Sequence, residues 1–187
     1  NNCPALTNII LPNSVTIIKD RAFKSCTLLQ EVTLPIGLET IGEEAFLDCI
    51  ELTAITIPNS VKSIENGAFV RCVALPSIDI PNNSHFTILN KDVFYGCSTI
   101  TSVDIPNNVT HIDNRAFQEC SSLMTVTIPE NVTTIGNDAF YKCTSLTSVT
   151  IPSTVTSIGD AAFDNCNNLT TVVSLADPAP ECGQYAF

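Results

Sequence analysis

Nine cysteines are the residues best suited to chemistry in this 187-residue chain. Structural zinc needs four ligands, commonly in pairs spaced about two to four residues apart, and no cysteine pair has that spacing. A catalytic thiol needs an orienting base, and the only histidines are His85 and His111. Seven cysteines instead recur every 23 to 25 residues: Cys26, Cys49, Cys72, Cys97, Cys120, Cys143 and Cys166. We expect no metal site and no cofactor.

Two roles remain for this column of cysteines. If the repeats stack, adjacent members lie about 5 Å apart, within the Cα range of a disulfide. Equivalent side chains in stacked repeats point in parallel, however, so we predict free structural thiols that pack behind the column of phenylalanines. Cys3 continues the spacing, and Cys182 falls outside it.

Asp79 and Asp104 are the second candidate for chemistry, because they occupy equivalent positions in adjacent repeats. On paired strands two such carboxylates repel each other. A calcium ion helped by Ser77 and Ser102 would relieve this, but calcium takes about six to eight oxygen ligands. The alternative is a pair of solvated carboxylates. A glycosidase would also need a cleft and unlike environments for the two acids, so we predict no catalytic residues and no enzyme.

One repeated motif positions all of these residues. Copies of L-x-x-V-x-I-P-x-x-V-x-x-I-x-x-x-A-F-x-x-C-x-x begin at Leu6, Leu29, Leu52, Leu75, Ile100, Leu123, Leu146 and Leu169. A unit this short buries its apolar stripe only against its neighbours, so the repeats predict a single solenoid over residues 1–187. We expect a partial coil at 1–5, an irregular or truncated end coil at 169–187, and full coils at 6–28, 29–51, 52–74, 75–99, 100–122, 123–145 and 146–168.

Each copy predicts the same short elements, illustrated by the copy at 146–168. Val149 and Ile151 alternate with polar residues, which is typical of a short strand ending at Pro152. Asp160 is suited to cap one helical turn that carries Phe163 and Cys166 inward. The predicted fold class is therefore an α/β repeat, in which each 23-residue coil has parallel short strands and one short helical turn.

The motif resembles the leucine-rich repeats of the BspA-like (Treponema pallidum-type) family, with the pattern LxxLxLPxxLxxIxxxAFxxC, over residues 6–168. The resemblance implies a secreted or cell-surface protein of host-associated bacteria or parasitic protists. It also implies adhesion to host proteins or to other cells.

Composition excludes other partners. The formal net charge is −11, with eight basic and nineteen acidic residues, so the chain lacks the cations that nucleic acid or an anionic membrane requires. No apolar run approaches the roughly 20 residues of a membrane-spanning helix. We therefore expect no nucleic-acid binding and no direct membrane insertion.

Contacts with a partner must then come from surface positions. The outward strand positions predicted to bind are Ser77, Asp79, Ser102, Asp104, Thr125, Thr127, Ser148 and Thr150. Two extra residues after Pro81 predict a loop that projects His85 and Phe86, and Leu47, Val70 and Tyr95 form a candidate apolar strip. The sequence thus favours a binding or adhesion module for a protein or glycan, with a structural spacer in a larger exported protein as the alternative.

Overall fold

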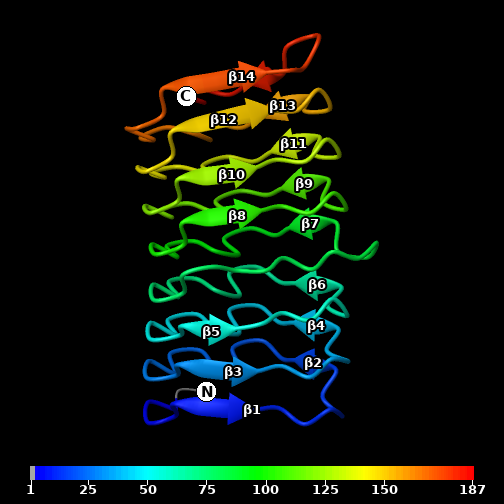
Figure 1. Cartoon of the computed structure of the whole chain (residues 1–187), viewed down its shortest axis with the longest axis vertical. Helices are drawn as coiled ribbons and strands as arrows, with labels where there is room; N and C mark the ends of the chain where they lie inside the picture. The colour runs from blue at the N-terminus through cyan, green and yellow to red at the C-terminus, as the bar shows by residue number, and fades with distance from the viewer. Residues whose placement is uncertain (1–2) are drawn as a thin grey trace.

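The computed structural model describes residues 3–187 as a stack of coils with parallel strands on two sides (Figure 1). The strands of one side are β1 (Asn8–Ile10), β3 (Glu31–Thr33), β5 (Ala54–Ile55), β8 (Ser102–Asp104), β10 (Thr125–Thr127), β12 (Ser148–Ile151) and β14 (Thr171–Ser174). The strands of the second side are β2 (Ile17–Ile18), β4 (Thr40–Ile41), β6 (Ser63–Ile64), β7 (Ile88–Leu89), β9 (His111–Ile112), β11 (Thr134–Ile135), β13 (Ser157–Ile158) and β15 (Glu181–Cys182).

Strand register confirms the predicted stacking of repeats. Asn8 pairs with Glu31 and Thr40 with Ser63, so each strand lies beside its equivalent one repeat away. The column phenylalanines stack with ring centroids 5.0 to 5.7 Å apart, and Phe69 and Phe94 are both fully buried. Such offset aromatic pairs add attraction beyond the area they bury. The core is therefore one continuous column of Leu, Val, Ile, Phe, Ala and Cys side chains.

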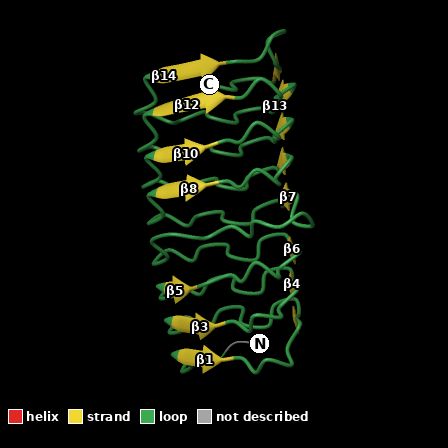
Figure 2. Ribbon diagram, turned by 45° about the vertical axis from the view of Figure 1, so that its right-hand side comes forward, coloured by secondary structure: helices red, strands yellow, loops and turns green. Residues whose placement is uncertain are grey.

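The predicted helical turn is wrong. Residues 3–187 contain no helix, and Figure 2 shows only strands joined by loops and turns. In every regular coil the residues two before and two after the column phenylalanine have positive φ, as at Glu44 (52°) and Asp48 (62°) around Phe46. A right-handed helix excludes this conformation. The segment is a chain of tight turns, which we call the Phe turn.

The Phe turns form a third side of hydrogen bonds between coils. The N–H groups of Arg21, Phe23 and Ser25 donate to carbonyls of the next coil at 2.7 to 2.8 Å, and the intervening N–H groups of Ala22 and Lys24 donate within their own turn. Successive N–H groups therefore alternate between donating to the next coil and closing the turn. This division satisfies backbone groups that a helix would have paired internally.

Asp160, which was predicted to cap a turn, and its equivalent Asn114 in an earlier coil act between coils. Asn114 Oδ1 accepts a hydrogen bond from the N–H of Asn137 in the next coil at 2.8 Å, and Asp160 Oδ1 accepts one from Gln184 at 2.6 Å. This approach requires glycine one residue before the donor. A Cβ on Gly136 would lie 2.6 Å from the backbone N of Asn114. The prediction that Asp160 caps its own turn is therefore wrong.

The fourth coil interrupts both strand ladders. No strand forms over residues 75–80, which leaves a gap between β5 and β8 (Figure 2). Pro76 explains this gap, because it has no N–H where the equivalent Gln30 and Met124 donate to the preceding coil at 2.7 and 2.9 Å. On the second side the sheet β2-β4-β6 ends, and β7 begins a separate five-stranded sheet.

Asparagine side chains join the third and fourth coils where the second ladder is broken. Asn83 Nδ2 donates to Val61 O at 2.7 Å, and Asn90 Nδ2 donates to Ile64 O at 2.7 Å. In the next coil the backbone N–H of Asp113 makes the bond equivalent to that of Asn90. The junction therefore relies on these side chains and on the intact Phe-turn side.

The last coil recovers its register after an irregular loop. Glu181 and Cys182 pair with Ser157 and Ile158, which places Cys182 at the position of the repeated isoleucine. Phe187 then stacks on Phe163 with ring centroids 5.3 Å apart.

Candidate functional site

All eight strand residues predicted to bind are exposed on one side of the solenoid, which we call the front face. Figure 1 shows β8, β10 and β12 stacked on this side. Ser102 pairs with Thr125, and Asp104 pairs with Thr127. Ser148 and Thr150 continue the rows in β12, paired with β14. Ser77 and Asp79 lie in the fourth coil, which has no strand at this position.

Hydroxyl groups divide into two sets by their hydrogen bonds. Thr110 and Thr133 donate from Oγ1 to the preceding coil at 3.1 and 3.2 Å, and Ser60 donates to Leu38 O at 2.6 Å. Within residues 3–187, the side chains of the eight front-face residues make no hydrogen bond to protein. The bonded hydroxyls hold coils together, whereas those of the front face have no protein partner within residues 3–187. The same is true of Thr40, Ser63 and Thr134 on the second side, so the front face differs by its exposure and not by its free hydroxyls alone.

The predicted pairing of Asp79 with Asp104 is wrong. Asp104 lies in β8, whose only paired neighbour is β10, and Asp79 lies in no strand. In the described part of the chain no group of three or more His, Cys, Asp or Glu side chains has the geometry of a metal site. These two carboxylates therefore do not belong to one strand ladder.

His85 and Phe86 separate in the inserted loop. His85 is exposed, and its backbone N–H donates to Asn83 Oδ1 at 2.9 Å. Phe86 is only 1% exposed. It takes the core position that valine or leucine holds in the other coils, as the bond from its N–H to Asn83 O shows. The prediction of a projecting Phe86 is wrong, because the extra residues precede it and only His85 remains at the surface.

The column cysteines are free and buried from Cys26 to Cys166, and Cys3 and Cys182 are free and exposed. Each thiol from Cys49 onward in the column points at the carbonyl of the phenylalanine in the preceding coil, at 3.1 to 3.3 Å, as from Cys97 Sγ to Phe69 O. Burial raises the pKa of Cys97 to about 12. The predicted structural thiols are therefore weak hydrogen-bond donors with little thiolate character.

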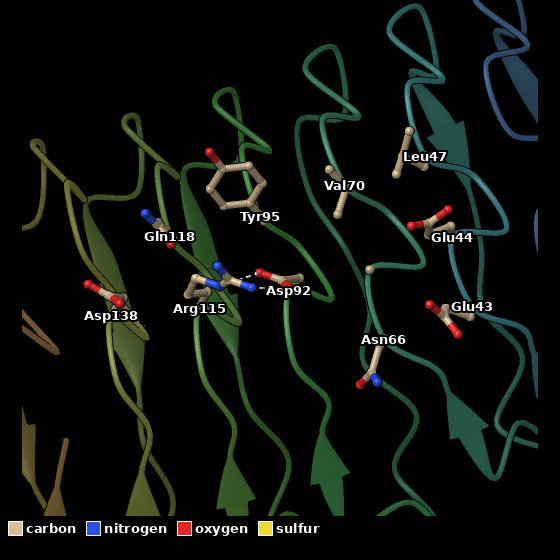
Figure 3. Close-up of a pocket in the computed structure, with 11 residues that line it drawn as sticks. Glu43, Glu44, Leu47, Asn66, Val70, Asp92, Tyr95, Arg115, Gln118 and Asp138 are labelled. Carbon is tan, nitrogen blue, oxygen red and sulfur yellow. Dashed lines mark hydrogen bonds and ion pairs between the residues drawn. The ribbon is translucent and has the colours of Figure 1, made fainter. Parts of the chain in front are cut away.

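A shallow depression of about 420 Å³ lies on the Phe-turn side (Figure 3). Its lining residues come from five successive coils: Glu43, Glu44, Leu47, Asn66, Gly67, Val70, Asp92, Tyr95, Arg115, Gln118 and Asp138. Figure 3 shows Leu47, Val70 and Tyr95 in one row, beside a second row with Glu44, Asp92 and Arg115. The apolar strip predicted from the sequence is thus half-buried and forms one wall of the depression.

Ion pairs between coils hold two of the lining carboxylates. Glu44 Oε2 contacts Lys24 Nζ and Arg21 Nε, both at 2.7 Å. The hydrogen bond from Lys24, followed by that from Arg21, lowers the pKa of Glu44. Arg115 contacts both oxygens of Asp92 at 2.8 Å. Opposite charges therefore face each other across neighbouring coils at these pairs.

Gly67 leaves space for the hollow, a role that was not predicted from the sequence. It occupies the column of Glu44, Asp92 and Arg115 but has no side chain, and its φ of 63° matches the positive φ of that column. The signal was available in the repeat alignment, since Gly67 is the only glycine in a column of mainly charged residues.

The family model for the BspA type leucine rich repeat region matches residues 1–123 and 87–187, with six copies. Among solved structures, a leucine rich cell surface protein from Faecalibacterium prausnitzii is 32% identical, with a TM-score of 0.80. The match covers 92% of this chain and 48% of that protein. The chain therefore belongs to the BspA-type leucine-rich repeat family, as the motif predicted.

Two further structures support the parallel solenoid. The leucine rich repeat protein of T. pallidum is 27% identical with a TM-score of 0.67, over 95% of this chain and 73% of that protein. A leucine-rich repeat protein from Bacteroides ovatus is 24% identical with a TM-score of 0.68, over 99% of this chain and 64% of that protein. No curated protein matched the chain.

This repeat family is typical of surface proteins that mediate binding, and its members are generally not enzymes. The chain spans about half the length of the F. prausnitzii protein. Within residues 3–187 no helix has the length and hydrophobicity to cross a membrane.

Proposed function

We propose that the chain is a non-enzymatic binding segment of a cell-surface or secreted protein, and that it contacts a protein or glycan through the front face. The free hydroxyls of this face carry the proposal. Several threonines and serines on other sides, such as Thr133, use their hydroxyls to join coils, whereas Ser102, Thr125 and Ser148 have no protein partner in the described chain and are exposed in regular rows. Regular rows of unused donors and acceptors suit a partner with repeated polar groups.

The geometry favours shallow, multivalent contact. Strand neighbours lie about 4.8 Å apart, and alternate residues within a strand lie about 6.8 Å apart. Each contact on an exposed polar surface contributes little by itself, so useful affinity requires several in parallel. Family membership and the cell-surface relative support this function over a purely structural role.

A spacer that holds another domain away from a surface is the second candidate. The continuous Phe column favours it, because stacked rings every 5.0 to 5.7 Å make a regular rod. The two functions differ in one respect, since a spacer requires no ligand.

Arrays of glycans and extracellular-matrix proteins test the proposal with the purified chain. The double variant Thr125→Arg, Ser148→Arg places two long side chains on the front face, and Asn107→Arg, Asn167→Arg makes the same charge change at exposed loop positions. We expect binding by the wild type and the loop variant, and at least about tenfold weaker binding by the front-face variant. A wild-type chain that binds nothing at micromolar concentration would refute the proposal and favour the spacer.

A further inference from the structure

We propose that the depression on the Phe-turn side binds an extended, basic segment of a partner protein, with a Lys or Arg side chain over the ring of Tyr95. This inference rests on the proposed binding function and adds the chemistry of a partner on a side separate from the front face.

The shape of the depression fits an extended segment that runs along the solenoid. Its lining runs from Glu43 to Asp138, which belong to the coils of Phe46 and Phe140. Spacings of 5.2, 5.7, 5.4 and 5.4 Å separate these coils, about 22 Å in all. An extended chain rises about 3.3 Å per residue, so six or seven residues cover this length.

The charges that line the depression indicate the net charge of the segment that would bind there. Four carboxylates and one guanidinium line the depression. Arg115 is held by Asp92, and Glu44 is held by Arg21 and Lys24. Glu43 and Asp138 are in no ion pair within residues 3–187, and the whole chain carries a net charge of −11. A basic segment is therefore complementary, and an acidic one is repelled.

Tyr95 supplies the specific contact, and the chain contains a precedent for it. Tyr141 holds the same place two repeats later, and Lys142 Nζ lies 5.2 Å from the centroid of its ring. After Tyr95 the equivalent position is Gly96, so no lysine follows this ring in the chain, although Arg71 and Lys142 lie near enough to act electrostatically on its hydroxyl. Burial and the nearby Glu119 raise the pKa of Tyr95, which keeps it a neutral phenol. An external cation can take the place that Lys142 takes over Tyr141.

The remaining lining residues suit the rest of a Lys or Arg side chain. Leu47 and Val70 are half-buried beside Tyr95 and offer apolar surface to an aliphatic stem (Figure 3). Gln118 Oε1 is enclosed but accepts no hydrogen bond within the described residues. A donor from a bound segment would satisfy this acceptor after a small rotation of the amide. Both features match a chain with basic groups and free N–H donors.

Fluorescence anisotropy with labelled peptides tests the inference. The probes are (Lys-Thr)4 and the uncharged (Gln-Thr)4, and the variants are Gly67→Arg and Ala161→Arg. Gly67 and Ala161 share one column and positive φ values of 63° and 52°, and Arg21 and Arg115 occupy that column naturally, so both variants are expected to fold. Only Gly67 lines the depression.

We expect (Lys-Thr)4 to bind the wild type and (Gln-Thr)4 not to bind. Gly67→Arg should weaken binding at least about tenfold, and Ala161→Arg less than about threefold. Tyr95→Leu should weaken it about three- to tenfold, which is the range of a cation–π contact, whereas Tyr141→Leu should not. Equal loss in Gly67→Arg and Ala161→Arg would show only diffuse attraction to an acidic chain and overturn the inference. An absence of peptide binding, with array binding retained through the front face, would overturn this inference and leave the proposed function intact.

Discussion

Substitution of Gly136 by alanine tests the close approach of coils on which the fold depends. A Cβ at this position would lie 2.6 Å from Asn114 N and 2.7 Å from Asn114 Oδ1 and Asp113 C. Two of these three atoms belong to the backbone, so no side-chain rotation relieves the contact. Carbon contacts are comfortable at about 3.5 Å or more, which requires the two coils to separate by about 1 Å at this point.

The cost follows from the bonds that this separation lengthens. Gly136 N donates to Ile112 O at 2.8 Å, and Asn137 N donates to Asn114 Oδ1 at 2.8 Å. Each such bond contributes about 1 kcal/mol, and overpacking itself costs about 1 to 3 kcal/mol. We expect Gly136→Ala to lower the free energy of unfolding by about 3 to 5 kcal/mol.

Gly37→Ala is the matched control, because a Cβ there has no atom within 4 Å. Restricting the unfolded chain at such a site is expected to stabilise by about 0.4 to 1 kcal/mol. Urea unfolding followed by far-ultraviolet circular dichroism measures both variants, and hydrogen exchange localises the loss to the coils on either side of Gly136. An unchanged midpoint for Gly136→Ala, or equal losses in both variants, would refute the close-approach argument.

Three further outcomes follow from the same contacts. The six buried column thiols with raised pKa values favour the protonated form in the folded chain, so their contribution to stability should be constant below about pH 9 and fall as pH rises toward 12, by about 1.4 kcal/mol per pH unit for each thiol; a pH titration of unfolding that stays flat between pH 9 and pH 11 would contradict this. Thr133→Val should cost about 1 kcal/mol by removing its 3.2 Å bond to Thr110 O, whereas Thr127→Val, on the front face, should stay within about 0.5 kcal/mol in the same urea assay. Pro76→Thr should restore the missing ladder donor, stabilise by about 1 kcal/mol and slow hydrogen exchange around residue 76, and unchanged exchange would show that Pro76 is not the cause of the gap.

The repeat spacing predicted the register of the whole core, because the periodicity of apolar residues is fixed by which side chains must face inward. Phe69 and Phe94 stack one period apart, as that spacing requires. The inward spacing of Ala162, Phe163 and Cys166 could not distinguish a helical turn from a series of tight turns, since both place these residues inward. The columns on either side of the phenylalanines held a usable signal, because they contain no β-branched residue and include Gly67 and Gly96.

Departures from the repeat were harder to interpret from the sequence. The two extra residues of the fourth copy located a loop, but the sequence did not reveal which residue would refill the valine position, and Phe86 did so because its apolar side chain gains from burial. Pro76 carried a clear signal, since proline cannot donate to a ladder. The depression is formed by side chains from five coils and by the lack of a side chain at Gly67. The sequence therefore predicted only the wall that lies in one column, from Leu47 to Tyr95, as an apolar strip.

The fourth coil links the architecture to the proposed contacts. Pro76 and the insertion remove strand hydrogen bonds on two sides, so the Phe turns carry the unbroken backbone connection from the third coil to the fourth, through bonds such as Phe69 N to Val93 O at 3.0 Å. The depression lies on this same side and crosses the junction, with Val70 before it and Tyr95 after it. A segment bound along the depression would therefore contact both parts of the rod where the fewest bonds join them. Binding there should slow hydrogen exchange of the Phe69 N–H, which donates to Val93 O. The slowing should be greater than that of backbone amides in coils beyond the depression.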